Sequence, residues 1–462
     1  MSDRIRSISP IDGSVVADRP AATADELDAK LDRAVQALRH WRKLPLSERI
    51  ERCTRMIDVL AARKGELARE LTLQMGRPIR YAPSEIRGFE DRSRVMLNLA
   101  GEALADHVPP EKKGFERFVR REPLGVVLVL AAWNYPYLIV ANTLLPALVA
   151  GNVVLLKHAD QTLLCAERLE EIAREAGIPG GVFQIAHMTH ELAGKIVADS
   201  RVDHVAFTGS VAGGVAVHAA AGGKLKSVGL ELGGKDPAYV REDANLSAAV
   251  ASLVDGAYFN SGQSCCGVER IYVAQSRYEE FVEQFVHLTR SYVLGNPLDT
   301  ETTLGPVVRK ANANAIRDQI DDAIKRGAQP LIHTSEFPDP GPAFVPPQVL
   351  VNVDHSMTIM REETFGPVVG IMPVISDSRA ISLMNDSVYG LTASLWTQDV
   401  SIARTLADQL DTGTVFMNRC DYLDPELAWV GVKKSGRGCT LSRVGFEHLT
   451  RPKSFHFKLG EG

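Results

Sequence analysis

The stretch VVLVLAAWNYPYLIVANTLLPALVAGNVVLL, residues 126–156, contains two short apolar runs, at 126–131 and 153–156, separated by a segment long enough for a helix. Three further apolar runs follow, at 182–185, 205–207 and 228–230. Continuous apolar strands that alternate with helices are typical of a mostly parallel sheet covered on both faces. The sequence therefore predicts a doubly wound α/β fold, in which a nucleotide commonly binds beyond the carboxyl ends of the strands.

A second alternating series begins after residue 235. Here we expect a helix over 245–259 and then a Gly/Ser/Cys loop. Strands are expected at 270–274, 368–374, 391–396 and 413–417. The first hundred residues instead show apolar positions three and four apart, as in Leu27, Leu31, Val35 and Leu38, which predicts amphipathic helices.

Residues 115–121 and 451–458 alternate between polar and apolar side chains and are expected to form strands. A last strand that leaves the core is often used to augment another sheet. We therefore expect the chain to assemble as a homodimer or homotetramer.

The composition is that of a globular protein of two or three domains. Its 462 residues are 45% apolar and 24% charged, which argues against disorder and coiled coil. The net charge is −5 and no basic block is present, so nucleic acid is not expected as a partner. The longest apolar run, 126–133, is far shorter than the ~20 residues of a membrane-spanning helix, and the amino end has no apolar signal region. Six cysteines without disulfide or metal-site spacing predict no metal centre and a reducing, cytoplasmic location.

Two adjacent cysteines, Cys265 and Cys266, lie in the Gly/Ser loop FNSGQSCC, residues 259–266. This is an unusual place for a core thiol, which more often replaces a small hydrophobic residue on a helix or strand. One interpretation is a buried and inert thiol. The other is a nucleophile, since a thiolate attacks carbonyl carbons readily when a neighbouring dipole or base stabilises it.

Polar residues also follow two of the predicted strands. Glu231 comes directly after the apolar run 228–230, so it is either ion-paired, for example with Lys235, or a general base whose pKa is raised by burial. Asn134 follows the run 126–131, where it either caps the next helix or donates its amide to a developing oxyanion. The segment FTGS, residues 207–210, with Gly214 indicates a strand, a tight turn and a helix start that can hold a pyrophosphate.

These motifs occur together, and in this order, in one family. The chain resembles the aldehyde dehydrogenase superfamily from about residue 5 to residue 458. The matching segments are WNYP at 133–136, LLK at 155–157, FTGS at 207–210, ELGGK at 231–235, GQSC at 262–265, EETFGP at 362–367 and the KKSGRG region at 433–438. The separation of 34 residues between Glu231 and Cys265 is also that of the family.

The resemblance implies an enzyme that oxidises an aldehyde to the carboxylic acid with a nicotinamide cofactor. Cys265 would add to the aldehyde to form a thiohemiacetal, and the side chain of Asn134 with the backbone N–H of Cys265 would form the oxyanion hole. After hydride transfer, Glu231 would activate the water that hydrolyses the thioester. Cys266 would be a packing residue.

The same resemblance implies a cofactor site. Lys157 matches the lysine that binds the adenosine ribose, and Asp160 lies where many members have an acid facing the same sugar. A carboxylate there accepts a hydrogen bond from the 2′-hydroxyl and repels a 2′-phosphate, so we expect NAD rather than NADP. The other residues implied at this site are Trp133, Thr208, Gly209, Ser210, Gly214, Leu232, Glu363 and Phe365.

We expect the segment NRCDYLDPELAWVG, residues 418–431, to shape a substrate tunnel. The residues implied in its lining are Tyr135, Tyr137, Ser264, Cys266, Asp421, Leu423 and Trp429. The acids Asp421, Asp424 and Glu426 have two interpretations: a solvated acidic loop, or an attraction for a cationic aldehyde such as an ω-aminoaldehyde. A semialdehyde is the other candidate substrate.

The resemblance also suggests an architecture. It comprises a dinucleotide-binding domain at 1–112 and 126–234, a catalytic domain at 235–447, and a small bridging sheet from 113–125 and 448–462.

Three rival functions make different demands on these residues. A CoA-acylating semialdehyde dehydrogenase would pass the acyl group to a thiol, but such relatives generally lack the base that Glu231 matches. A cysteine hydrolase would need a histidine beside Cys265 and would leave FTGS and EETFGP unexplained. A non-catalytic relative would have no need of Cys265, Glu231 and Asn134 together.

Overall fold

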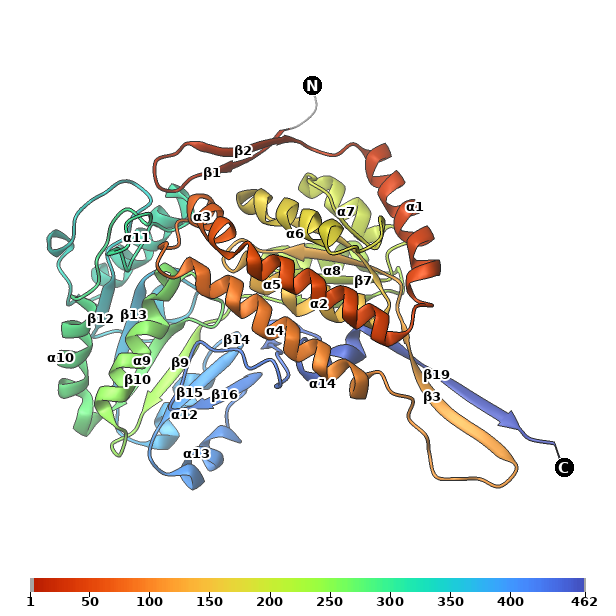
Figure 1. Cartoon of the computed structure of the whole chain (residues 1–462). Helices are drawn as coiled ribbons and strands as arrows, with labels where there is room; N and C mark the ends of the chain where they lie inside the picture. The colour runs from red at the N-terminus through yellow and green to blue at the C-terminus, as the bar shows by residue number, and fades with distance from the viewer. Residues whose placement is uncertain (1–3, 461–462) are drawn as a thin grey trace.

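The computed structural model describes residues 4–460 and contains two sheets of mainly parallel strands (Figure 1). In the first sheet the strand order is β18-β8-β7-β4-β5-β6. Its strands are β4 (Val126–Ala131), β5 (Val153–His158), β6 (Phe183–Ile185), β7 (His204–Thr208), β8 (Ser227–Glu231) and β18 (Gly436–Arg437). All pairings in it are parallel except that of β18 with β8. The five apolar runs that predict the fold are thus strands of one sheet, which confirms the doubly wound α/β class.

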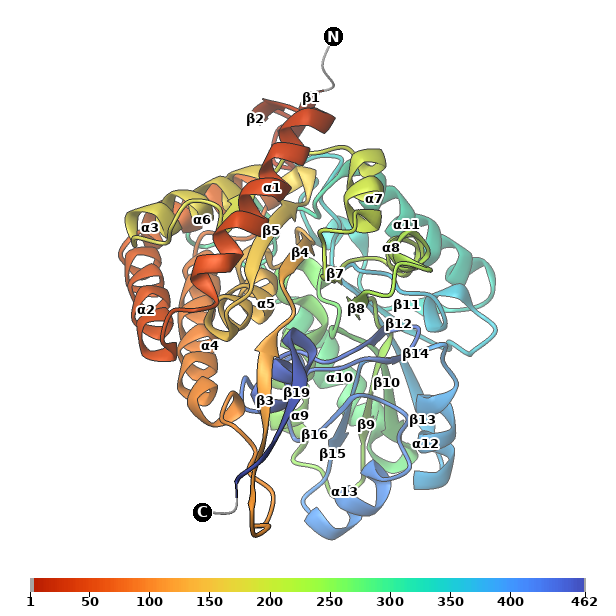
Figure 2. The same cartoon turned by 90° about the vertical axis from the view of Figure 1, so that its right-hand side faces the viewer.

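Helices cover both faces of this sheet. Helices α5 (Pro136–Ala150) and α6 (Leu163–Glu175) follow β4 and β5, whereas α7 (His190–Ala198) and α8 (Val211–Ala221) follow β6 and β7. The strand order reverses after β6, so right-handed crossovers place the two pairs of helices on opposite faces, as Figure 2 shows. Every residue of β4 and β5 is buried, which explains the apolar sequence of β4 and of the first four residues of β5.

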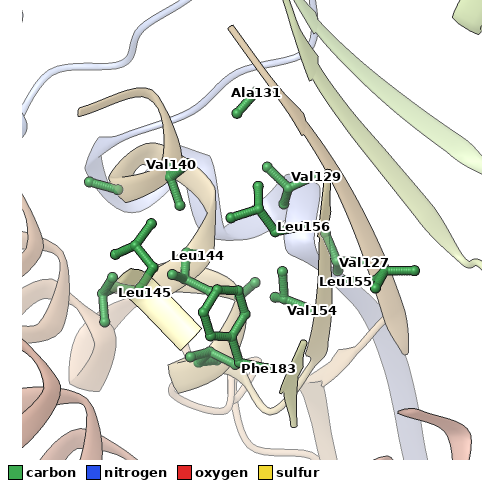
Figure 3. Close-up of a cluster of buried hydrophobic side chains, with 14 of the residues drawn as sticks. Val127, Val129, Ala131, Val140, Leu144, Leu145, Val154, Leu155, Leu156 and Phe183 are labelled. Atoms are coloured by element: carbon green, nitrogen blue, oxygen red, sulfur yellow. The ribbon is translucent and has the colours of Figure 1, made fainter. Parts of the chain in front are cut away.

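The core between this sheet and α5 is made of aliphatic side chains. Figure 3 shows Val154 and Leu156 of β5, with Phe183 of β6, facing Leu144 and Leu145 of α5. All five side chains are nearly or completely buried. This packing fixes the position of α5, and with it the turn between β4 and α5 that carries Asn134.

The first hundred residues form the expected helices and, in addition, one hairpin that the sequence pattern does not predict. The helices are α1 (Ala24–Trp41), α2 (Leu46–Ala62), α3 (Lys64–Met75) and α4 (Ala82–Ala103). Strands β1 (Arg4–Ile8) and β2 (Val15–Pro20) precede them as an antiparallel pair. The inward positions of β1 are Ile5 and Ser7, and Ser7 donates a hydrogen bond to the backbone oxygen of Gln161 at 2.6 Å. A buried serine hides the apolar alternation by which such a strand is recognised.

The second sheet has the order β11-β12-β13-β10-β9-β15-β16, and only the β11–β12 pairing is antiparallel. Its strands are β9 (Asp236–Val240), β10 (Val268–Ala274), β11 (Gln329–Pro330), β12 (Gln348–Val351), β13 (Val368–Val374), β15 (Thr392–Trp396) and β16 (Thr414–Met417). The accompanying helices are α9 (Leu246–Tyr258), α10 (Tyr278–Thr289), α11 (Lys310–Lys325), α12 (Asp377–Asn385) and α13 (Val400–Ala407). The four strands and the helix expected after residue 235 are present, and β9, β11 and β12 are additional.

A two-stranded antiparallel arm, β3 (Phe115–Pro123) with β19 (Thr450–Lys458), extends away from both sheets (Figure 1). Both strands agree with the sequence prediction. The boundaries of the expected domains stay a prediction. Strand β18, which comes from the range 235–447, pairs with β8 of the first sheet.

Within residues 4–460 no helix combines the length and the apolar character that crossing a bilayer requires.

Candidate active site

Two cavities meet near the carboxyl ends of the strands of the first sheet. The larger one, of about 620 Å³, lies between α4, α5, the loop that carries Cys265 and the segment 421–429. The second, of about 500 Å³, lies between the β7–α8 turn, α7 and the residues that follow β4 and β5. Thr208 at the end of β7 lines both cavities, so they are neighbours across one residue.

Cys265 is half-buried and lines the larger cavity. The loop before it contains Asn260 and Ser261, both with positive φ angles, of 55° and 57°. Such a backbone persists when its surroundings hold it. Here the side chain of Asn260 receives a hydrogen bond from Nε of Arg77 at 3.0 Å and donates to the backbone oxygen of Gln263 at 3.1 Å. The thiol therefore lies at the end of a rigidly held loop.

Asn134 faces this loop. Its Nδ2 donates to the backbone oxygen of Gln263 at 3.2 Å, and its own backbone oxygen accepts from Nη2 of Arg77 at 2.7 Å. The side chain does not cap α5, whose N-terminal N–H at Tyr137 donates to Glu85 at 2.8 Å instead. Of the two interpretations of Asn134, the helix cap is excluded, and the amide lines the larger cavity.

Glu231 ends β8 and also lines the larger cavity. Its carboxylate accepts hydrogen bonds from the hydroxyls of Thr440 and Thr208 and from Nδ2 of Asn142, the last two at 3.3 and 3.4 Å. Burial raises the pKa of Glu231, and these donors, together with the charge of Arg92, partly oppose the rise. Lys235 pairs with Glu269 and so does not neutralise Glu231.

A half-buried carboxylate, that of Asp421, holds the residues on both sides of Cys265. Oδ1 of Asp421 accepts from the hydroxyl of Ser264 at 2.7 Å and from Sγ of Cys266 at 3.0 Å. Burial raises the pKa of Asp421, while Cys266, Ser264 and the charge of Arg77 lower it. Cys266 itself is buried, at 2% exposure, which agrees with a packing role.

The second cavity has the features of a phosphate and nucleotide cleft. The implied cofactor residues in its lining are Trp133, Lys157, Thr208, Gly209 and Ser210. Ser210 caps α8 through its hydroxyl, which accepts from the N–H of Gly213 at 3.2 Å. A side chain at Gly209 or Gly213 would come within 2.7 Å of the ring of Phe207. The glycines thus make room for Phe207. The N-terminus of α8, a helix of eleven residues, lines the cleft, where backbone N–H groups favour an anion.

The other implied cofactor residues border this region without lining the cavity. Gly214 packs against Leu232, and Nζ of Lys157 forms an ion pair with Asp160 at 2.9 Å. Glu363 accepts from the N–H of Gly234 at 3.0 Å, and its burial, with the nearby charge of Glu269, raises its pKa to about 8. Phe365 lies edge-on to Trp133, with ring centres 5.6 Å apart.

The expected substrate residues are brought together with one exception. Those in the lining of the larger cavity are Tyr135, Ser264, Cys266, Asp421, Leu423 and Trp429. Tyr137 is completely buried and does not line the cavity. It lies two positions after Tyr135 at the start of α5, and residues two apart on a helix do not share a face.

Sequence reasoning missed three residues of the site. Arg92 of α4 and Asn142 of α5 line the larger cavity, and Thr440 bonds Glu231. The amide of Asn142 within the apolar helix 136–150 was a usable signal, because an amide buried among aliphatic side chains needs a partner. Arg92 is one arginine among several in an amphipathic helix, and neither it nor Thr440 has a local signal. Among residues 4–460 no cluster of three or more potential ligand side chains is placed to hold a metal ion.

Comparisons with known proteins agree with these observations. A model of the aldehyde dehydrogenase family matches residues 1–455. The chain is 35% identical to the succinate semialdehyde dehydrogenase [NAD(P)+] Sad of Escherichia coli K12, over 96% of each chain. It is 34% identical to succinate-semialdehyde dehydrogenase [NADP(+)] 1 of Mycobacterium tuberculosis H37Rv, over 97% of this chain and 99% of the relative.

The structure is similar to that of an NAD-dependent aldehyde dehydrogenase from Sinorhizobium meliloti. The TM-score is 0.95 at 33% identity, over the whole of this chain and 92% of the other. A family match over nearly the whole length, relatives above 30% identity and the same fold all agree. The chain therefore belongs to the aldehyde dehydrogenase family.

Proposed function

We propose that Cys265, Glu231 and Asn134 carry out the oxidation of an aldehyde to its carboxylic acid. The observation that carries this proposal is the convergence of all three side chains on one cavity, which adjoins the nucleotide-type cleft at Thr208. A thiol, a carboxylate of raised pKa and a buried amide donor are the groups that addition, deacylation and oxyanion stabilisation need.

In this proposal the thiolate of Cys265 forms a bond with the carbonyl carbon, and the carbonyl oxygen becomes an oxyanion that receives a hydrogen bond from Asn134. A bound nicotinamide supplies the acceptor for the hydride that leaves this carbon. The acyl group then remains on Cys265 as a thioester. Glu231 takes a proton from water as the water oxygen bonds to the acyl carbon, the C–S bond breaks, and the thiolate and the carboxylic acid are released.

For the cofactor we propose NAD in preference to NADP. The open N-terminus of α8 fits a pyrophosphate, and Lys157 lies in the cleft lining with Asp160 paired to it. A carboxylate at Asp160 favours a free ribose hydroxyl over a phosphate. The names of the curated relatives include NADP(+) and NAD(P)+, so this preference would set the chain apart from them.

For the substrate we propose a semialdehyde, since both curated relatives are named for succinate semialdehyde. Neither name describes CoA acylation, and the base that the acylating alternative generally lacks is present here as Glu231. All six cysteines are unpaired, which supports a reducing compartment such as the cytoplasm.

The proposal is tested by following nicotinamide reduction at its absorbance band with the purified protein. Succinate semialdehyde and butanal are supplied with NAD or with NADP, with and without CoA. We expect NADH and the free acid without CoA, and a higher kcat/KM with NAD than with NADP. Cys265→Ser should abolish turnover, whereas Cys266→Ser should retain measurable turnover.

Other outcomes would overturn parts of the proposal. Turnover that requires CoA would support the acylating alternative. Ester hydrolysis without any nicotinamide reduction would support the cysteine hydrolase. Full activity of Cys265→Ser would exclude Cys265 as the nucleophile.

A further inference from the structure

Arg92 is a buried cation in the wall of the larger cavity. It lies on α4, is 9% exposed, and is the one lysine, arginine or histidine among the residues described as lining this cavity. A buried guanidinium has a high desolvation cost and normally has an anionic or carbonyl partner for most of its donors. For Arg92, the protein supplies acceptors for only some of these donors.

Two of its nitrogens have no protein acceptor. Nη1 donates to the backbone oxygen of Leu138 at 3.2 Å and to Oδ1 of Asn142 at 2.6 Å. Nε and Nη2 make no hydrogen bond to any residue within 4–460, and neither is among the sealed, unpaired side-chain atoms, which are Ser93 Oγ and Tyr137 OH. Nε and Nη2 thus have no hydrogen-bond partner in the described part of the chain but remain accessible. We take them to face the larger cavity, because Arg92 lines it.

Nε–H and Nη2–H lie on the same edge of the guanidinium plane and point in parallel. This edge matches the two oxygens of a carboxylate, which accept both hydrogen bonds at once. An aldehyde group alone would satisfy only one donor, whereas a second, anionic end of the substrate would satisfy both.

We propose that Arg92 binds the carboxylate of a substrate that carries an aldehyde at its other end. The inference rests on the proposed function, because it assigns the aldehyde end to Cys265. It deepens that function by naming the group that selects a semialdehyde over a plain alkanal, and the residue that binds it.

The acids of the cavity do not contradict an anionic substrate. Glu231 and Asp421 already accept hydrogen bonds from protein donors. The hydroxyl of Thr440 donates to Glu231, and that of Ser264 donates to Asp421. The other acids in the lining are Asp91, Asp255, Asp424 and Glu426, and all four are exposed. Charges in contact with water are screened over about 8 Å at physiological salt, so they act weakly on a buried subsite.

Arg92 has a second connection that the experiment must separate. Nη1 donates a hydrogen bond to Asn142, and Asn142 donates one to Glu231. Arg92 therefore also helps to position the proposed base. Loss of that support would slow deacylation of every substrate. Loss of a carboxylate contact would instead affect only substrates that have a carboxylate, and mainly their KM.

The test compares succinate semialdehyde, butanal and γ-trimethylammoniobutanal in wild type, Arg92→Gln and Arg92→Lys. We expect wild type to prefer succinate semialdehyde. In Arg92→Gln its kcat/KM should fall about 10- to 100-fold, as expected for a hydrogen-bonded charge pair, and mainly through KM. The kcat/KM for butanal should fall much less, because butanal has no carboxylate and loses only the support that Arg92 gives Glu231 through Asn142. Arg92→Lys keeps the charge but not the parallel donors. Its kcat/KM for succinate semialdehyde should lie between those of wild type and Arg92→Gln.

Arg94→Gln is the matched control, because Arg94 lies on the same helix with its side chain 39% exposed and paired with Asp58 and Glu90. Arg94→Gln should leave kcat/KM unchanged for all three substrates. Equal losses for succinate semialdehyde and butanal in both Arg92 variants, carried by kcat, would overturn the proposal and leave Arg92 a positioning residue for Glu231. A wild-type preference for the cationic aldehyde would overturn it in favour of the acidic segment. Failure of the proposed function is separate, since it would abolish butanal oxidation in wild type.

Discussion

Glu231 is held among neutral donors rather than against a lysine, and this environment gives it the character of a base. Burial raises the pKa of Glu231, so the carboxylate form gains as the pH rises through a value above the usual carboxyl range. If Glu231 activates the deacylating water, steady turnover should rise with pH along this titration. The rise should be absent from Glu231→Gln.

Pre-steady-state kinetics test the same role directly. Glu231→Gln should still release a burst of NADH, because hydride transfer precedes deacylation, and its steady rate should be lower by about 100-fold or more. Thr440→Val tests the same carboxylate without removing it. Loss of the Thr440 hydrogen bond should raise the pKa of Glu231 and shift the rise in turnover to higher pH. A Glu231→Gln protein with no burst would show that the carboxylate is needed earlier, for activation of the thiol.

At the scale of residues, the sequence was informative where chemistry departs from packing. Cys265, Glu231 and Asn134 are polar or reactive groups in loops or at strand ends, and the structure brings all three to one cavity. Arg92 is different, because only the three-dimensional packing of α4 tells which arginine of that helix is turned inward. Tyr137 shows the converse, as its proximity to Tyr135 in sequence suggested a shared wall that helix geometry does not allow.

Among the structural elements, the loop that carries the nucleophile depends on one glycine. Gly262 has a φ of +70°, and a side chain there would lie 2.1 Å from the backbone oxygen of Gly366. Gly262→Ala should therefore displace the loop, lower the free energy of unfolding by about 1–3 kcal/mol and greatly reduce kcat. Thermal denaturation and steady-state kinetics measure both effects.

Gly177→Ala is the matched control for this substitution. Gly177 has a φ of +78°, but nothing lies within 4 Å of the position of its added carbon. It should show the cost of the left-handed backbone alone and keep full activity. Should Gly262→Ala be as stable and as active as Gly177→Ala, contact with Gly366 would not be what positions the loop.

Two of the strands that the sequence failed to predict, β1 and β9, share a physical cause. Strand β9, DPAYV, begins with aspartate and proline, which are depleted in strands, yet it lies near the centre of the second sheet. Asp236 is tolerated there because the backbone N–H of Thr392 donates to its carboxylate at 3.1 Å and the Thr392 hydroxyl bonds it as well. In β9, as in β1, a tertiary partner satisfies a polar residue that local patterns count against a strand.

At the scale of the whole molecule, the arm formed by β3 and β19 has few contacts with the body. Within it Phe118 and Phe455 stack at 4.4 Å, and Phe457 is 48% exposed. We propose that this arm joins copies of the chain into a dimer or tetramer, because two strands alone are marginally stable in water. Light scattering after size exclusion should give a mass of two or four chains.

Truncation tests the arm. Removal of residues 451–462 should lower the number of chains in the assembly. A shorter truncation that ends at Lys458 and keeps β19 should leave that number unchanged. A wild-type protein that is monomeric at micromolar concentration would contradict the proposal.

Asp421 has a consequence for any redesign of this enzyme. Its carboxylate accepts hydrogen bonds from Cys266, 155 residues earlier in the chain, and from Ser264. The segment 421–429, which lines the larger cavity, therefore also holds the loop that carries the reactive sulfur. Changing the preference for one aldehyde over another through that segment will thus disturb turnover too.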